Sequence, residues 1–269
     1  MSDDRVRLRA GDLARVSSRA LYLQAFLTAE RMQGPGFAFA LLPILRRLYK
    51  AGDRGEALRR HLGYFNTHPV LAGCVLGAVA RLEEKRARGE AVPVEQIETL
   101  KRGLASPLAA LGDPLFWVTL RPLAGLLGVL GMGLLPVLDR PGPDLRVLLC
   151  PLIVLLTYNA VALPLRVSGV ARGYLHAEEP LVLLRALRLR EWQATLERIG
   201  AFAYGVVAAL TVMLLLESAA GEGRGPVVHA APLVLGAIVG IGVLGRWPGR
   251  VVEAALTALG LAALLSIPF

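Results

Sequence analysis

The chain has 269 residues, of which 55% are hydrophobic, and its mean hydropathy is +0.54. This composition is too apolar for an ordinary soluble domain, so it favours an all-α integral membrane protein. The formal net charge of +9 could indicate nucleic-acid binding. However, the basic residues precede the hydrophobic half or lie in short loops within it, as the positive-inside rule predicts. We therefore expect contact with the lipid bilayer and no nucleic-acid partner.

Cysteine and histidine give no sign of a metal centre. The only cysteines, Cys74 and Cys150, lie in apolar surroundings, and we expect both to be free thiols. The histidines, His61, His68, His176 and His229, show no ligand spacing with one another or with the cysteines. We expect no bound metal, and we interpret His68 as a capping or hydrogen-bonding residue. The charged N-terminus lacks an apolar segment, so no cleavable signal peptide is expected.

Residues 9–49 have helical spacing, with Asp12 as a possible cap. Gly34, Pro35 and Gly36 interrupt this pattern, and we expect them to divide it into two helices. Glu30 and Arg31 stand just before the interruption. They are either a solvated pair at a helix end or polar contacts inside a broken membrane element.

The next helical region follows a turn that ends at Pro69, with Thr67 as a plausible N-cap. The small residues Gly73, Gly77 and Ala80 recur at spacings of four and three, which predicts close helix packing. The charged run from Glu83 to Arg88 is typical of a solvated helix end. Residues 94–102 then predict a short amphipathic helix on the cytoplasmic side.

The stretch 103–122, GLASPLAALGDPLFWVTLRP, is apolar but contains four helix breakers, Pro107, Gly112, Pro114 and Pro122. It also carries Asp113 and Arg121, which a lipid-exposed helix tolerates poorly. Irregular backbone at membrane depth survives only where protein or a water-filled cavity surrounds it. We therefore expect a re-entrant or broken element that lines a polar site. This expectation divides the chain into an N-terminal helical region, 1–102, and a membrane domain, 103–269.

The second half predicts four to five transmembrane helices, at 123–138, 147–165, 199–216, 227–244 and 251–269. The loop 166–198 is rich in arginine, which places it and the N-terminus in the cytoplasm of a multi-pass protein. Within this loop, Leu181–Arg198 has the pattern of an amphipathic helix. It could lie at the membrane interface or dock a partner protein.

The sequence lacks the recognised motifs for nucleotide binding, zinc proteolysis and serine hydrolysis. A carboxylate pair of Asp113 and Glu30 could serve a membrane-embedded hydrolase, but no nucleophile accompanies it. We expect no cofactor and no catalytic residues in this chain. Polar residues among broken apolar helices favour a pathway for a solute.

Several strings in order make the chain resemble the IID membrane component of the mannose-type (mannose/fructose/sorbose) sugar phosphotransferase system. They are ERMQGPGFAFALLPILRRLY at Glu30–Tyr49, RRHLGYFNTHP at Arg59–Pro69, LGAVARLEEKRARG at Leu76–Gly89, LASPLAALGDPLFWVTLRP at Leu104–Pro122 and, more weakly, NAVALPLRVSGVARGY at Asn159–Tyr174. The match covers residues 9–175 well and the remainder only by pattern.

The resemblance implies a permease subunit in the cell (inner) membrane that pairs with a IIC component in a hetero-oligomer. That pair would import a hexose-like sugar, coupled to phosphorylation by IIA and IIB partners, so no phosphohistidine is expected here. By resemblance, the sugar would contact polar residues inside the matched strings, namely Glu30, Asn66, Asp113, Thr119 and Arg121. Because the chain departs from the family at 185–200, the alternative is a non-transporting scaffold or regulatory component.

Overall fold

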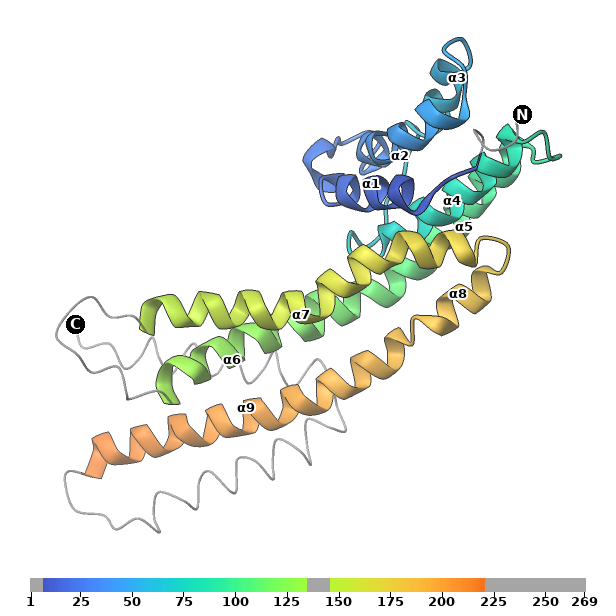
Figure 1. Cartoon of the computed structure of the whole chain (residues 1–269). Coiled ribbons are helices and arrows are strands. Elements are labelled where there is room, and N and C mark those ends of the chain that lie inside the picture. The colour runs from blue at the N-terminus through green and yellow to red at the C-terminus, as the bar shows by residue number, and fades with distance from the viewer. Residues whose placement is uncertain (1–6, 135–145, 221–269) are drawn as a thin grey trace. The chain divides into compact units, whose positions relative to one another are not determined.

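The computed structural model describes residues 7–134 and 146–220, and its elements there are helices joined by turns (Figure 1). The chain divides into two compact units. Of the described residues, unit 1 comprises 7–114 and 159–189, and unit 2 comprises 115–134, 146–158 and 190–220. The long helix α7 (Arg146–Leu175) contributes its first part to unit 2 and its second part to unit 1. The division into an N-terminal region 1–102 and a membrane domain 103–269 stays a prediction.

Unit 1 is a cluster of short and medium helices around an apolar core. In order it contains α1 (Ala10–Ala20), η1 (Leu23–Phe26), α2 (Gly34–Leu48), α3 (Arg54–Arg59), α4 (Ala72–Ala87), α5 (Val94–Asp113), the second half of α7 and α8 (Pro180–Ala186). Helix α1 packs on α2, and α4 packs on both α2 and α5. The large, fully buried side chains include Phe37, Leu41, Ile44, Leu76, Ile97, Leu104 and Leu108.

Local sequence signals explain where the first two long helices begin. Asp12 lies in the first turn of α1 and accepts a hydrogen bond from the Arg9 N–H at 2.9 Å, so it belongs to a capping box but is not itself the N-cap. Asp12 also pairs with Arg47 of α2 at 3.2 Å. The Gly34–Gly36 segment begins α2, where proline in the first turn is tolerated. The residues before it form the short 3₁₀ helix η1 and a turn rather than a long helix.

Glycine brings α4 and the second half of α7 into backbone contact. A Cβ atom on Gly77 would overlap the carbonyl oxygen of Val170, and one on Gly173 would overlap that of Cys74. A Cβ on Gly73 would lie 3.2 Å from the Arg166 carbonyl oxygen. The prediction that small residues serve close packing is thus confirmed for both α4 glycines. Cys74 is a buried free thiol and Cys150 is a half-buried one, as expected.

Unit 2 contains η2 (Pro114–Leu120) and α9 (Leu189–Ala220), each without its first residue, together with α6 (Arg121–Leu134) and the first half of α7. The expected break in the stretch 103–122 takes the form of a change from α-helix to π-helix at Pro114, not of a loop. A π segment accommodates the missing proline donor and widens the helix locally. The proposal that this stretch is re-entrant stays a prediction.

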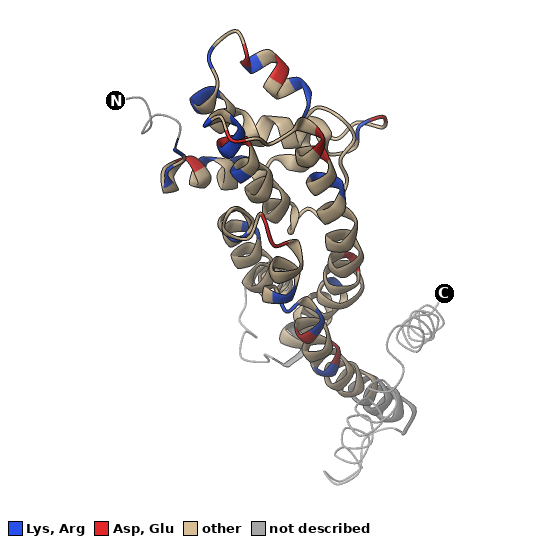
Figure 2. Ribbon diagram, turned by 90° about the vertical axis from the view of Figure 1, so that its right-hand side faces the viewer, with Lys and Arg blue, Asp and Glu red and all other residues tan. Residues whose placement is uncertain are grey.

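Within residues 7–134 and 146–220, two helical runs are long and apolar enough to cross a membrane, Val94–Gly131 and Leu148–Leu175. The expected crossing 147–165 lies within α7, and 199–216 lies within α9. Residues 135–138 of the first expected crossing, and all of 227–244 and 251–269, lie outside the described residues. Charged residues, in contrast, are numerous on the short N-terminal helices (Figure 2).

The expectation of one amphipathic helix at Leu181–Arg198 is wrong. Helix α8 ends at Ala186, and α9 begins at Leu189. Between them Arg188 has a φ of 50°, in the left-handed region, which ends the first helix and redirects the chain. Leu181 and Trp192 are nevertheless exposed, as an interfacial or docking surface requires.

Candidate functional site

Two segments of unit 1, residues 28–33 and 63–68, lie side by side and are called the paired loops here. Met32 pairs with Thr28 across a tight turn and with Phe65 in parallel. The Gln33 N–H donates to the Phe65 carbonyl at 2.8 Å, and the Phe65 N–H donates to the Arg31 carbonyl at 3.3 Å. Met32 has a φ of 50°, which is unusual for a residue with a side chain. The first loop is therefore held in a specific conformation by the second.

The side chain of Gln33 strengthens this pairing. Its Nε2 donates to the Thr67 carbonyl at 2.8 Å, and its Oε1 accepts from the Thr67 N–H at 3.2 Å. Gln33 is buried, so both halves of its amide are satisfied away from water. Thr67 is not the N-cap of α4, which begins at Ala72; its hydroxyl donates to the Ala105 carbonyl of α5 at 2.8 Å.

Close backbone approaches position the paired loops against α2 and α5. A Cβ atom on Gly34 would overlap the carbonyl oxygen of Gly63, so only glycine permits the second loop to cross the start of α2. A Cβ on Gly112 would lie 2.5 Å from the Cβ of His68. The second loop therefore contacts the C-terminal end of α5, one residue before Asp113.

The five predicted site residues fall into two groups. Glu30 and Asn66 are exposed on the two paired loops, and Asp113 is exposed at the end of α5 beside the His68–Gly112 contact. These three lie on contacting segments of unit 1. Thr119 and Arg121 belong to unit 2, where Thr119 is buried and Arg121 lies over the Trp117 ring at 5.5 Å. The structure does not place this second group relative to the first.

Behind the paired loops, the α4 residue Glu83 is the centre of a buried polar cluster. Its carboxylate accepts hydrogen bonds from Arg60 Nε at 2.8 Å, Arg60 Nη2 at 2.9 Å, His61 Nε2 at 2.8 Å and the Tyr49 hydroxyl at 2.6 Å. We call these four residues the Glu83 cluster. Because a carboxylate only accepts, the Nε2 of His61 carries the proton. The expectation that Glu83 belongs to a solvated helix end is wrong, since its exposure is 0%.

The environment of the Glu83 cluster fixes its protonation states. Burial tends to raise the pKa of Glu83, but the hydrogen bonds from His61 and Arg60 outweigh it and lower the pKa to about 2. Burial lowers the pKa of His61 and raises that of Tyr49. The cluster therefore holds an ionised carboxylate beside a guanidinium, with neutral imidazole and phenol groups, near neutral pH.

Lys101 of α5 joins the Glu83 cluster to the paired loops. This buried ammonium donates to the His61 carbonyl at 3.3 Å. Its Nζ also lies 4.5 Å from the centroid of the Phe37 ring and 5.4 Å from that of Phe65, where cation–π attraction favours it. The two rings are themselves 4.5 Å apart. Phe65 thus contacts both the ammonium and the first paired loop.

Glu84, the next residue of α4, forms a second buried centre with different partners. Its carboxylate accepts from the Leu8 N–H at 2.8 Å, from Arg81 Nη1 at 2.9 Å and from the Tyr174 hydroxyl. The exposure of Glu84 is also 0%, so the expectation that it belongs to a solvated helix end is wrong as well. Because these partners lie in the N-terminal segment, α4 and α7, Glu84 stabilises helix packing away from the paired loops.

Burial also explains the state of His68. Its side chain is 1% exposed, and burial together with the positive charge of Arg166 lowers its pKa to about 4. Its carbonyl accepts from the Leu71 N–H at 2.9 Å and the Ala72 N–H at 3.1 Å at the start of α4. His68 is therefore neutral at pH 7 and contributes a backbone cap to this helix.

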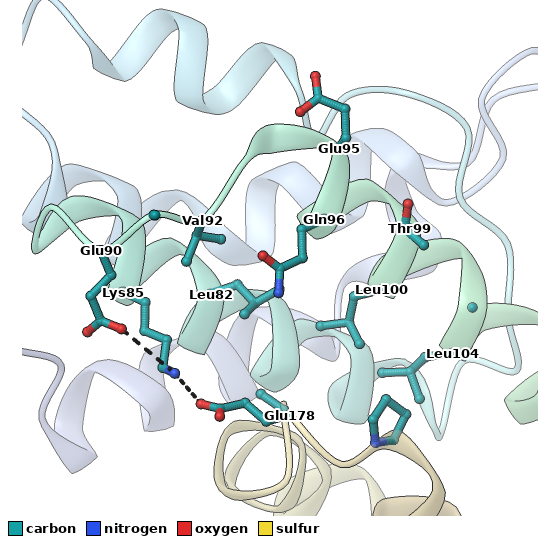
Figure 3. A pocket seen from close by; sticks show the side chains of 14 residues that line it. Leu82, Lys85, Glu90, Val92, Glu95, Gln96, Thr99, Leu100, Leu104 and Glu178 are labelled. Atoms are coloured by element: carbon teal, nitrogen blue, oxygen red, sulfur yellow. Dashed lines mark ion pairs between the residues drawn. The ribbon is translucent and has the colours of Figure 1, made fainter.

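A cavity of about 810 Å³ lies elsewhere in unit 1, between α4, α5 and the start of α8 (Figure 3). Lys85 forms ion pairs there with Glu90 at 3.7 Å and with Glu178. None of the five predicted site residues lines it. The remaining cavity walls include Leu82, Val92, Gln96, Thr99, Leu100 and Leu104.

In the described ranges 7–134 and 146–220, no three residues of the His, Cys, Asp or Glu type are grouped to hold a metal ion.

Comparison with known proteins identifies the relatives of this chain. The family model for the IID component of the mannose/fructose/sorbose PTS family matches residues 7–239. The mannose-specific EIID component of Escherichia coli (strain K12) is 40% identical over 170 residues, which are 62% of this chain and 56% of that protein. The fructose permease IID component of Bacillus subtilis (strain 168) is 31% identical over 203 residues, which are 75% of this chain and 70% of that protein.

A solved structure shares the fold. In the cryo-EM structure of the mannose transporter ManYZ with microcin E492, one chain is 28% identical to this one, with a TM-score of 0.54. The superposition covers 96% of this chain and 97% of that chain.

Proposed function

We propose a sugar-transport function from one premise: the chain belongs to the family of IID components of the mannose/fructose/sorbose phosphotransferase system. In this proposal the chain pairs with a IIC membrane subunit, and the pair imports a hexose-like sugar. IIA and IIB partners carry the phosphoryl group, so this chain contributes binding and gating rather than catalysis. The observation that carries the proposal is the family match over residues 7–239, which includes both paired loops and the end of α5.

The candidate sugar site consists of polar side chains presented by a rigid framework. Glu30, Asn66 and Asp113 supply carboxylate and amide groups, which hydrogen-bond well to sugar hydroxyls. All three are exposed, whereas the backbone beneath the first two is fixed by the Gln33–Thr67 hydrogen bonds. Such preorganisation lowers the entropic cost of binding. The family resemblance also assigns sugar contact to Thr119 and Arg121, which belong to unit 2.

The proposal includes a location and an orientation. The chain lies in the inner membrane as a multi-pass protein, with its N-terminus in the cytoplasm. The arginines between 166 and 198 support this orientation through the positive-inside rule. The cytoplasmic side is also where the IIA and IIB partners would deliver the phosphoryl group.

Uptake measurements test the site. We expect Asp113→Asn and Arg121→Gln each to lower kcat/KM for the transported hexose by about tenfold in the complete system with IIA, IIB and IIC. Glu56→Gln on α3, an exposed acid outside the proposed site, serves as the control and should transport normally. Unchanged uptake of a hexose panel in both site variants would overturn the site assignment.

The second candidate, a non-transporting scaffold, rests on the altered region between 175 and 200. There the structure has two helices separated at Arg188 rather than one continuous helix. Co-purification with a IIC subunit without sugar binding or uptake by the pair would favour the scaffold. Detectable uptake of any hexose would exclude it.

A further inference from the structure

Helix α4 carries two adjacent buried carboxylates whose partners differ, and this difference points to a role for one of them in binding. The contacts of Glu84 lead to Leu8 and Tyr174, whereas those of Glu83 lead to His61. His61 lies two residues before the second paired loop, which pairs with the first loop at Phe65. Only the Glu83 contacts therefore continue into the proposed sugar site.

His61 is held at two points from two helices. Glu83 of α4 accepts from its ring, and Lys101 of α5 donates to its carbonyl. All three residues are buried, so water cannot easily replace these contacts. The position of His61 is consequently determined by α4 and α5 together.

The constraint continues along the chain to the site. Phe65 packs its ring on Phe37 and under the Lys101 ammonium, and its backbone pairs with Arg31 and Gln33. Asn66 follows immediately. Each step from Glu83 to the exposed site is thus a hydrogen bond, a ring contact or a covalent bond between fixed groups.

We propose that Glu83 and Lys101 are positioning residues for sugar binding: by fixing His61, they hold the paired loops that present Glu30 and Asn66. This inference rests on the proposed transport function for its substrate. Its structural part, that the Glu83 cluster fixes the paired loops, holds independently of what the loops bind. The two parts therefore have separate tests.

The first test is kinetic and uses matched neighbours. In the complete transport system, we expect Glu83→Gln to raise KM for the hexose about tenfold, with Vmax per folded complex changed less than about twofold. Glu84→Gln, which alters an equally buried acid without a path to the paired loops, should leave KM unchanged. Lys101→Met should raise KM as Glu83→Gln does. Equal KM values for wild type and Glu83→Gln, or equal increases in the Glu83 and Glu84 variants, would overturn the proposal.

Hydrogen exchange supplies a readout without sugar. The amides of Gln33 and Phe65 donate across the paired loops, so their exchange reports the pairing directly. We expect Glu83→Gln to accelerate exchange in both about tenfold and Glu84→Gln to leave it unchanged. If the wild type neither binds nor transports hexoses, but exchange is still faster in Glu83→Gln than in Glu84→Gln, the transport function fails and the structural part stands. If the wild type transports but the difference is absent, the positioning role is wrong.

Tyr49→Phe provides a milder variant. It removes one donor to Glu83 while the Arg60 ion pair remains, so the fold is retained even if Glu83→Gln does not accumulate. The expected effect is a KM rise of about two- to threefold with a matching acceleration of exchange at Gln33 and Phe65. Unchanged KM and unchanged exchange in this variant would also overturn the proposal.

Discussion

The two halves of α4 use opposite means to hold their neighbours. In the first half, Gly73 and Gly77 lack side chains, and the α7 backbone approaches closely enough to touch them. In the second half, Glu83 and Glu84 are fully buried and attract donors from several elements. The first interface depends on shape, the second on charge and hydrogen bonding. One helix therefore joins a membrane-type packing surface to a polar core that fixes loops.

The charged half should be the more sensitive to a change that preserves shape. Glu83→Gln leaves the guanidinium of Arg60, whose side chain is 9% exposed, without its counter-charge. We expect a loss of about 3 kcal/mol in the free energy of unfolding. Glu84→Gln should cost less, because its partner Arg81 is 32% exposed and can recover water. Thermal unfolding of the purified complex checks that Glu83→Gln is destabilised more than Glu84→Gln. Equal losses of stability in the two variants would contradict this prediction.

The glycine half should respond to a single added methyl group. Gly77→Ala would place a Cβ against the Val170 carbonyl and force α4 away from α7, at a cost of about 2 kcal/mol. Gly103→Ala on α5 is the matched control, because nothing lies within 4 Å of a Cβ there. It should stabilise the helix by about 0.5 kcal/mol. Similar melting temperatures for the two variants would show that the α4–α7 contact is loosely packed.

A smaller effect is expected from acidification. The pKa of His68 is about 4 in the folded state and near 6.5 when unfolded, so the unfolded chain binds more protons between these values. Stability should therefore fall as the pH decreases from 6.5 towards 4, by about 1–2 kcal/mol at pH 5. The lowered pKa of His61 adds to the same slope, whereas Glu83 stays ionised throughout this window. Equal melting temperatures at pH 7 and pH 5 would contradict this prediction.

The two halves of α4 also differ in how well sequence predicts them. The close packing of Gly73 and Gly77 follows from residue size and spacing, which are visible in the sequence. Glu83 and Glu84, in contrast, begin a run of charged residues, and such a run predicts a solvated helix end. A usable signal existed, since Glu83 lies four residues after Val79 and seven after Leu76, on the buried face of the helix.

The candidate site is also only partly predictable from the sequence, because its segments are far apart along the chain. The sequence singles out Glu30 and Asp113 as polar residues at breaks in apolar stretches, and the family resemblance adds Asn66 and joins the three in one site. However, the Gln33–Thr67 pairing that connects two of their segments spans 34 positions, which helical periodicity does not report. Likewise, Pro114 signals a break in the apolar stretch, but not that a π-helix replaces the α-helix there.

An exposed carboxylate near the same helix provides the smallest expected effect. Glu178 pairs with Lys85 of α4 at the wall of the cavity in Figure 3, but its side chain is 61% exposed and the Lys85 side chain 20% exposed. Water and salt screen such a pair, and the ammonium keeps Glu90 as a second partner. Glu178→Gln should therefore leave the melting temperature of the complex unchanged at both low and high salt. A decrease comparable to that of Glu84→Gln would mean that the cavity wall depends on this pair. It would also mean that burial does not determine how much each acid around α4 contributes to stability.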